Sequence, residues 1–233
     1  MLKTTKSKLV PIILSVCIVL GLALVFLSKS AFTTGEVAKP SEPKSYEVKF
    51  SPDYEVNGDV KGIVANSDYI VKGHYEKFVE DWNMGENYLS EVYTFIVDEE
   101  LAGETGKTIE VAIPHTIHLE SNEAGENVEA ELNLPNYNKP DFNKEYVLFL
   151  KKLQTKDAYG PASVPFQVEI GSDNIVELLT NTENTDSEKV TKSKSVIRFT
   201  SEPIDLSKID KISGKNKDEL FKEIENELEN KTE

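Results

Sequence analysis

The sequence predicts a mainly β fold: an antiparallel OB-like barrel or sandwich with a short helix at each end, preceded by one transmembrane helix. Three observations lead to this prediction. Short runs of alternating apolar and polar residues, rich in β-branched and aromatic side chains, recur through the middle of the chain. Turn segments containing glycine separate several of these runs. One long apolar segment stands at the start, and a segment with helical spacing of apolar residues stands at the end.

The apolar segment 9–28 carries no charged residue. At about 1.5 Å per residue, a helix of this length spans the roughly 30 Å hydrocarbon core of a bilayer. Lysines precede the segment, so the positive-inside rule places residues 1–8 in the cytoplasm and everything after the segment outside. We therefore expect a single-pass protein of the cell membrane whose C-terminal domain lies outside the cytoplasm. A cleaved signal peptide that ends before Ala31 is the alternative.

Residues 29–45 are polar and proline-containing, as expected for a linker, and residues 46–233 form the predicted extracytoplasmic domain. The net charge of the whole chain is −15, and the first thirty residues contribute only positive charges. An acidic domain of this kind excludes nucleic acid as a partner and favours cations or basic envelope proteins. The one cysteine, Cys17, lies in the apolar segment, so no disulfide is expected in the domain, which is predicted to be a monomer.

The domain begins with a short helix that ends near Asn66, and the alternating residues after Tyr69 indicate a strand. In SEVYTFIVDEEL, Tyr93, Phe95 and Val97 share one face of the next strand. The segment AGETGK supplies two glycines for a turn, and TIEVAI again alternates. Together these segments predict a β-hairpin.

The segment EYVLFLKK is apolar for five residues, which is typical of a strand covered on both faces. PFQVEI and IVELL, separated by GSDN, predict a second hairpin, and SVIRF predicts one more short strand. The polar tracts 120–138 and 181–194 are predicted as loops. Segment 215–230 predicts an amphipathic helix, with an apolar stripe formed by Leu220, Phe221, Ile224 and Leu228.

The succession of SDYIVKGHY, YTFIVDEELAGETGKTIEVAI and KEYVLFLKK, within about residues 60–170, resembles uncharacterised membrane-anchored or secreted domains of Gram-positive bacteria. More distantly it is similar to the netrin-like, OB-type barrel of tissue metalloproteinase inhibitors. The resemblance implies a fold. It implies no function, because the disulfide-bonded N-terminal cysteine with which those inhibitors block the protease metal has no counterpart in this sequence.

Three segments contain potential metal ligands. In HTIHLE, odd spacing on an extended chain directs His115 and His118 to opposite sides, whereas His118 and Glu120 share a side. These two are the candidates for a metal site, and the alternative is that they are ordinary polar residues at a strand end. Segment 53–64 imitates a calcium loop but lacks the glutamate at its twelfth position. The glutamate-rich tract 120–131 is interpreted as a solvated loop, with loose binding of divalent cations as the alternative, and no cofactor is predicted.

The sequence contains no phosphate-binding loop, dinucleotide fingerprint or serine-hydrolase motif. It therefore favours a membrane-tethered extracytoplasmic binding module without catalytic residues. An envelope hydrolase or metal-dependent enzyme, or a protease-inhibitor-like domain, are the alternatives. Trp82 and Tyr88 lie in the polar segment EDWNMGENYLS, which is predicted as a loop. They are the candidate contact residues, unless Trp82 folds back onto the barrel as an anchor.

Overall fold

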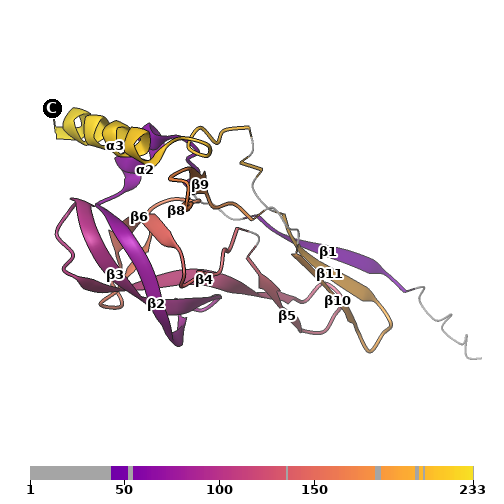
Figure 1. Cartoon of the computed structure of the whole chain (residues 1–233). Helices are drawn as coiled ribbons and strands as arrows, with labels where there is room; N and C mark the ends of the chain where they lie inside the picture. The colour runs from indigo at the N-terminus through magenta and orange to yellow at the C-terminus, as the bar shows by residue number, and fades with distance from the viewer. Residues whose placement is uncertain are drawn as a thin grey trace, which may run out of the picture. The chain divides into compact units, whose positions relative to one another are not determined.

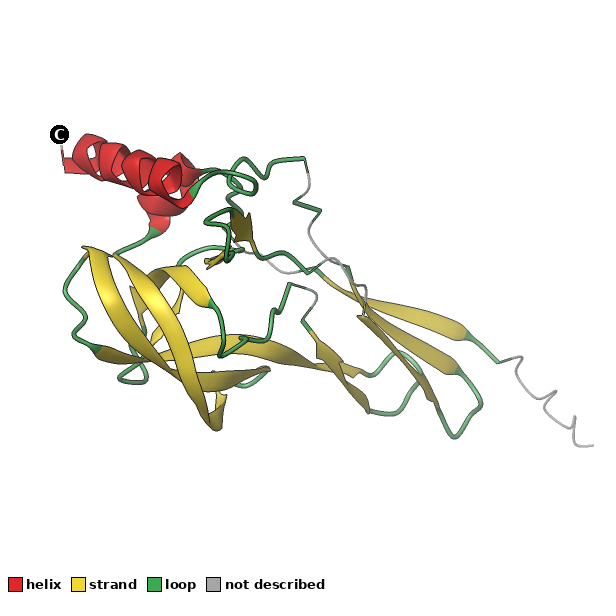
Figure 2. Ribbon diagram, viewed as in Figure 1, coloured by secondary structure: helices red, strands yellow, loops and turns green. Residues whose placement is uncertain are grey.

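The computed structural model describes residues 43–51, 55–134, 136–181, 185–202, 205–206 and 208–232. Strands form the largest part of these residues and one helix lies toward each end, which confirms the mainly β prediction (Figure 1, Figure 2). The predicted membrane segment 9–28, the N-terminal residues before it and most of the predicted linker fall outside the described residues. Within the described ranges, no helix has the length and apolar character needed to cross a bilayer.

Five strands form a partial barrel: β2 (Tyr69–Asn83), β3 (Tyr88–Ala102), β4 (Thr108–Ser121), β6 (Glu145–Lys152) and β7 (Tyr159–Pro161). β2 pairs antiparallel with β3 and, through its first five residues, with β6. β3 pairs antiparallel with β4, which meets β7 in parallel at Val111 and Tyr159. Since β7 also pairs with β6, the pairings return to β2. The first predicted hairpin is β3 and β4, and the second is β8 (Gln167–Ile170) and β9 (Val176–Leu178), which extends from β6.

A group of aromatic side chains packs together within the mainly aliphatic core of the barrel. The Tyr75 ring meets the rings of Phe95, Tyr146 and Tyr93 edge-on, with centroids 5.0, 5.2 and 5.7 Å away. Such pairs contribute about 0.5–1.5 kcal/mol each beyond the area they bury. The Tyr75 hydroxyl donates to Gln167 Oε1 at 2.8 Å, so this buried polar group is satisfied.

Gly73 lies on β2 where that strand pairs with β3 on one side and β6 on the other. A Cβ atom at this position would stand 1.9 Å from the carbonyl oxygen of Ile96 and 2.8 Å from the Phe95 ring. A glycine is therefore required for the close approach of the two backbones.

Two helices pack against each other beside the barrel core. α2 (Val60–Asn66) is capped by Asp59, whose carboxylate accepts from the Gly62 N–H at 2.9 Å. α3 (Lys217–Thr232) buries Leu220 and Ile224. Lys231 near its end donates to the carbonyls of Val64 in α2 and of Ser67, the C-cap of α2. These helices confirm the predicted helix ending near Asn66 and the predicted helix 215–230, the latter shifted by two residues.

A second, three-stranded sheet has the order β1 (Ser45–Phe50), β11 (Val196–Ser201), β10 (Thr185–Val190). β1 pairs with β11 in parallel, and β10 pairs with β11 antiparallel. The prediction of a loop over 181–194 is therefore wrong. TDSEKV has one apolar residue, Val190, which is 69% exposed, so the strand is held by its pairing with β11 rather than by burial of its own side chains.

The prediction of a loop over 120–138 is also wrong, because β4 continues to Ser121 and β5 (Val128–Asn133) returns beside it. In VEAELN, small apolar residues alternate with acidic ones, so the average polarity hides a period of two. The inner face of this hairpin packs against β11 through a second apolar cluster, formed by Ile117, Ala130, Leu132, Leu134, Ile197 and Phe199.

Candidate functional site

An open pocket of about 420 Å³ lies beside the start of β3 and the middle of β4. Its volume falls within the range of roughly 300–1,000 Å³ that is common for ligand sites. The walls are mainly apolar and come from segments far apart in the chain. They include Met84, Tyr88, Ile113, Leu134, Tyr137, Ala162, Val164, Phe166 and Leu179.

One wall of the pocket is the segment 161–167, which is fixed by backbone hydrogen bonds on two sides. The Ala162 N–H donates to the Phe149 carbonyl at 3.1 Å, and the Phe149 N–H donates to the Phe166 carbonyl at 3.0 Å. On the other side, the Val164 N–H donates to the Glu55 carbonyl at 2.8 Å. This wall is therefore held in place by backbone hydrogen bonds to β6 and to the segment before α2.

The opposite wall includes Leu134 and residues 136–138, and the latter are tied to the residues just after β9. The Asn138 side chain donates to the Leu179 carbonyl at 3.3 Å, and the Asn181 side chain donates to the Tyr137 carbonyl at 3.2 Å. The Gln167 amide donates to the Asn138 carbonyl at 3.3 Å. Since these amides are engaged within the wall, the surface presented to a ligand is dominated by apolar side chains.

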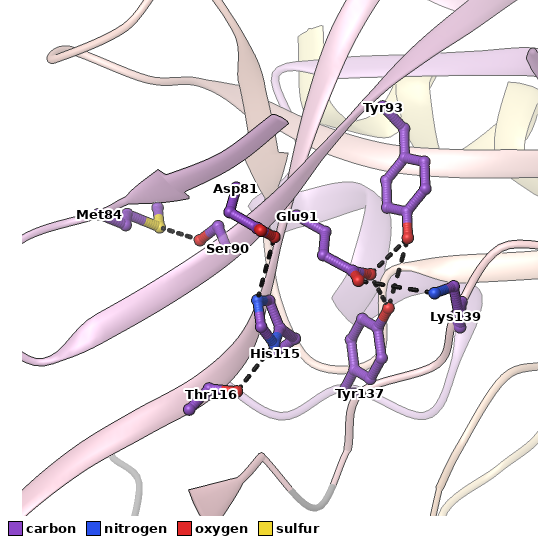
Figure 3. A network of polar contacts seen from close by, with 9 residues as sticks. All are labelled: Asp81, Met84, Ser90, Glu91, Tyr93, His115, Thr116, Tyr137 and Lys139. Atoms are coloured by element: carbon purple, nitrogen blue, oxygen red, sulfur yellow. Dashed lines mark hydrogen bonds and ion pairs between the residues drawn. The ribbon is translucent and has the colours of Figure 1, made fainter. Parts of the chain in front are cut away.

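A carboxylate network borders the pocket at Tyr137 (Figure 3). Glu91, only 16% exposed, accepts hydrogen bonds from the hydroxyls of Tyr93 and Tyr137 through one oxygen. Its other oxygen lies 3.7 Å from Lys139 Nζ. Glu91 and Tyr93 are two residues apart on β3, so both side chains leave the same face of the strand.

This network fixes the protonation states of its members. Burial raises the pKa of the Glu91 carboxyl, but hydrogen bonds from Tyr137 and Tyr93 and the charge of Lys139 lower it more, so the pKa lies below its ordinary value. Burial and the hydrogen bond to Glu91 raise the pKa of Tyr93 and of Tyr137 above the ordinary range. Glu91 is therefore an ionised acceptor held by two protonated hydroxyls. Such an arrangement positions Tyr137 as a wall of the pocket and makes Glu91 a poor proton acceptor for a substrate.

His115 lies beside the network, with its ring centroid 5.8 Å from that of Tyr137. Its Nδ1 lies 2.8 Å from Thr116 Oγ1, while its buried Nε2 has no hydrogen-bond partner and lies 3.9 Å from an Asp81 carboxylate oxygen (Figure 3). Ser90, which neighbours Glu91, directs its hydroxyl at Met84 Sδ, 3.4 Å away. A nucleophilic hydroxyl is activated by a histidine that is itself hydrogen-bonded to a carboxylate. The Ser90 hydroxyl contacts no histidine, and the histidine beside the Thr116 hydroxyl is not hydrogen-bonded to a carboxylate, so neither residue has this arrangement.

The two predicted contact residues occupy different environments. Tyr88 lines the pocket, and its ring meets Phe50 edge-on with centroids 6.4 Å apart. Trp82 lies on β2, which continues to Asn83, so the predicted loop 80–90 is shorter than expected. Lys156 Nζ stands over the Trp82 ring, 5.7 Å from its centroid, and is also ion-paired with Glu80 and Glu110. Trp82 is not among the residues that line the pocket.

The two predicted metal candidates come together with a third residue. His118 Nε2 lies 3.6 Å from Glu120 Oε1 and 3.9 Å from Glu129 Oε2, and donor atoms of all three residues lie within 4.8 Å of one another. Glu129 is not among the predicted metal ligands, because its polar surroundings are typical of a loop, whereas it lies on β5 opposite Glu120. The signal that could have found it is the alternation in VEAELN.

The imitation of a calcium loop falls partly outside the described residues, since Asp53 is not among them. Of its members that are described, Asp59 caps α2. The hydrogen bond from the Gly62 N–H lowers the pKa of Asp59, and this influence outweighs partial burial, which raises the pKa. This residue therefore acts as a helix cap in the structure.

Comparison with known proteins gives no relative: no protein-family model, curated protein sequence or solved structure matches the chain significantly.

Proposed function

We propose that this chain is a non-catalytic binding module in which the pocket beside β3 receives apolar side chains of a partner protein of the cell envelope. The observation that carries the proposal is the preformed pocket of about 420 Å³, whose walls are held by hydrogen bonds within the domain and expose mainly apolar side chains.

The charge of the chain limits the choice of partner. With a net charge of −15, the chain repels acidic surfaces, and Glu55 adds a carboxylate to the pocket lining. A neutral or basic protein with exposed apolar residues is the complementary partner.

The proposed setting is the outer surface of a cell membrane. Residues 9–28 are proposed as a single transmembrane anchor, and the domain that follows as an OB-like module outside the cytoplasm. The closed pairing of β2, β3, β4, β7 and β6, with one parallel pair, supports an OB-type Greek-key barrel.

The chain has two methionines, and this allows a direct test. Met84 lines the pocket, and the other methionine is Met1. Cells that produce the full chain are grown with a photoactivatable methionine analogue and irradiated, and cross-linked peptides are identified by mass spectrometry. We expect a partner protein linked through position 84.

The test variant is Ala162→Leu, and its matched control is Ala65→Leu. Ala162 lines the pocket, whereas Ala65 is exposed on α2, so the same added volume blocks the pocket only in the first variant. Cross-linking at position 84 should fall at least about fivefold in Ala162→Leu, which corresponds to about 1 kcal/mol, and stay unchanged in Ala65→Leu. An equal yield in both variants, with an unchanged fold by circular dichroism, would overturn the proposal.

A further inference from the structure

We propose that His118, Glu120 and Glu129 bind one divalent transition-metal ion of the Zn²⁺ type on the outer face of the β4–β5 hairpin. This site is separate from the apolar pocket, since none of the three residues lines it.

The register of the hairpin brings these residues together. Glu120 lies directly opposite Glu129, and His118 lies opposite Glu131. Side chains alternate along each strand, so all four leave the same face, while Ile117, Ala130 and Leu132 leave the other. The nitrogen donor of His118 and two carboxylates therefore converge from two paired strands.

The separations of the donor atoms suit a metal. A tetrahedral Zn²⁺ ion with bonds of about 2.0–2.1 Å has its ligand atoms about 3.3 Å apart. His118 Nε2 lies 3.6 Å from the Glu120 oxygen and 3.9 Å from the Glu129 oxygen, so small rotations of the side chains bring the atoms to these positions. Three protein ligands leave a fourth position for water or for a donor from a partner.

Electrostatics also favours a cation at this place. Two carboxylates directly opposite each other on neighbouring strands repel, and this pairing destabilises the hairpin unless a positive charge lies between them. A divalent ion bound between them neutralises both carboxylates and takes a neutral imidazole as its third ligand.

The scaffold is suited to hold the donors in place. The inner face of the hairpin packs against Ile197 and Phe199 of β11, so the ligands project from supported strands. The side chain of His118 is 32% exposed and those of Glu120 and Glu129 are 55% and 54% exposed, which leaves the site open to an ion from solvent.

The structure provides a matched comparison in His74. Its Nδ1 lies 3.7 Å from an Asp98 carboxylate oxygen, and this histidine is also partly exposed. It belongs to no group of three metal-ligand side chains in the part of the chain that the structure describes. If Zn²⁺ simply bound to any exposed histidine beside a carboxylate, replacing His74 and replacing His118 would weaken Zn²⁺ binding equally.

The test is titration of the full chain, prepared without a histidine tag, with Zn²⁺ alone, by calorimetry and by competition with a chromophoric chelator. We expect one ion per chain. Removing even a residue that only hydrogen-bonds to a metal ligand commonly lowers the metal affinity about 10–100-fold. His118→Gln and Glu129→Gln, which remove a ligand itself, should therefore each weaken Zn²⁺ binding at least about tenfold. The control variants His74→Gln and Glu131→Gln should bind Zn²⁺ within about twofold of the unsubstituted chain.

Two further measurements decide between a metal site and a diffuse acidic surface. Co²⁺ should give visible absorption bands that disappear in His118→Gln, and Ca²⁺ should not displace Zn²⁺, because an imidazole nitrogen favours transition metals. Unchanged Zn²⁺ affinity in His118→Gln, or equal competition by Ca²⁺, would overturn the proposal. Since all four substituted positions lie outside the buried core, unfolding midpoints without metal serve as the check that each variant is folded.

Discussion

The hydroxyl group of Tyr137 donates a hydrogen bond to the carboxylate of Glu91, which lies 46 residues earlier in the chain. This bond joins β3 to the segment that forms one wall of the pocket, and Tyr93 donates to the same carboxylate oxygen. The ionised carboxylate, rather than either tyrosine alone, therefore determines the position of the wall.

Replacing Glu91 by Gln should lower the free energy of unfolding by about 1–3 kcal/mol, because hydrogen bonds to a charged acceptor are lost at a largely buried site. Urea unfolding of the full chain measures the change. The control is Glu86→Gln, an exposed position in the β2–β3 turn, where we expect a change within about 0.5 kcal/mol. Equal effects of the two substitutions would contradict the structural role of Glu91.

The same residue predicts a dependence of stability on pH. The pKa of Glu91 is lower in the folded chain than its ordinary value of 4.5, so the unfolded chain binds a proton first as the pH falls. The stability that Glu91 contributes is thus complete above pH 4.5 and is lost as the pH falls through the folded value. Urea midpoints of the unsubstituted chain and of Glu91→Gln should converge over this range. A constant difference between them down to about pH 3, well below the ordinary carboxyl range, would be incompatible with the lowered pKa.

Replacing Gly73 by Ala should destabilise the barrel by about 1–3 kcal/mol or more, because the added Cβ would collide with the Ile96 carbonyl oxygen. Gly160→Ala is the matched control: the nearest atom to its Cβ, at 2.9 Å, is the end of the flexible Leu153 side chain. That variant should lose less than about 1 kcal/mol, since the leucine can move. Thermal unfolding of both variants provides the measurement, and equal losses would show that β2 and β3 can separate at Gly73.

Tyr88 and Trp82 should behave differently when each is replaced by alanine. Tyr88→Ala removes part of the pocket wall and should reduce cross-linking at position 84 several-fold. Trp82→Ala removes a ring beneath Lys156, at a cost of about 0.5–1 kcal/mol of stability, and should leave cross-linking unchanged. A loss of cross-linking in Trp82→Ala alone would place the contact surface on the outer face of β2.

The proposed anchor predicts the distribution of the chain after cell fractionation. Because residues 9–28 form a long uncharged apolar segment, the full chain should remain with membranes after carbonate extraction. Protease added outside intact cells should remove the domain from its anchor. Mature protein released into the medium with Ala31 as its first residue would instead establish the cleaved signal peptide.

The strands that the sequence predicted correctly are those with a strong internal pattern. In TIEVAI, Ile109, Val111 and Ile113 are all buried on one face, as their alternation indicated. β10 was missed because its stability comes from pairing with β11 and its own residues are nearly all polar. β5 was missed because its average polarity hides its period of two. Glu129 and Glu131 make VEAELN look like a solvated tract, although the strand is fixed by β4 and by the apolar cluster beneath it.

The pocket could not be predicted, because its walls come from residues that are far apart in the sequence. Met84 lies in the β2–β3 turn, Leu134 follows β5, and Ala162 follows β7. Nothing in the local pattern around these residues indicates that they meet. Of the two aromatic residues singled out in segment 80–90, Tyr88 lines the pocket and Trp82 does not. The Trp82 ring lies under Lys156, a residue 74 positions later that no local pattern connects with it.

The parallel pairing of β1 with β11 has a consequence for biosynthesis. Ser45 pairs with Val196 and Phe50 pairs with Ser201. β1 therefore cannot pair with β11 until almost the whole chain has been translated. During this interval the backbone groups of β1 are open to chaperones and to other nascent chains. A premature stop codon before Val196 would leave β1 permanently without its partner and would make the truncated product a substrate for degradation, even if the barrel strands had already paired.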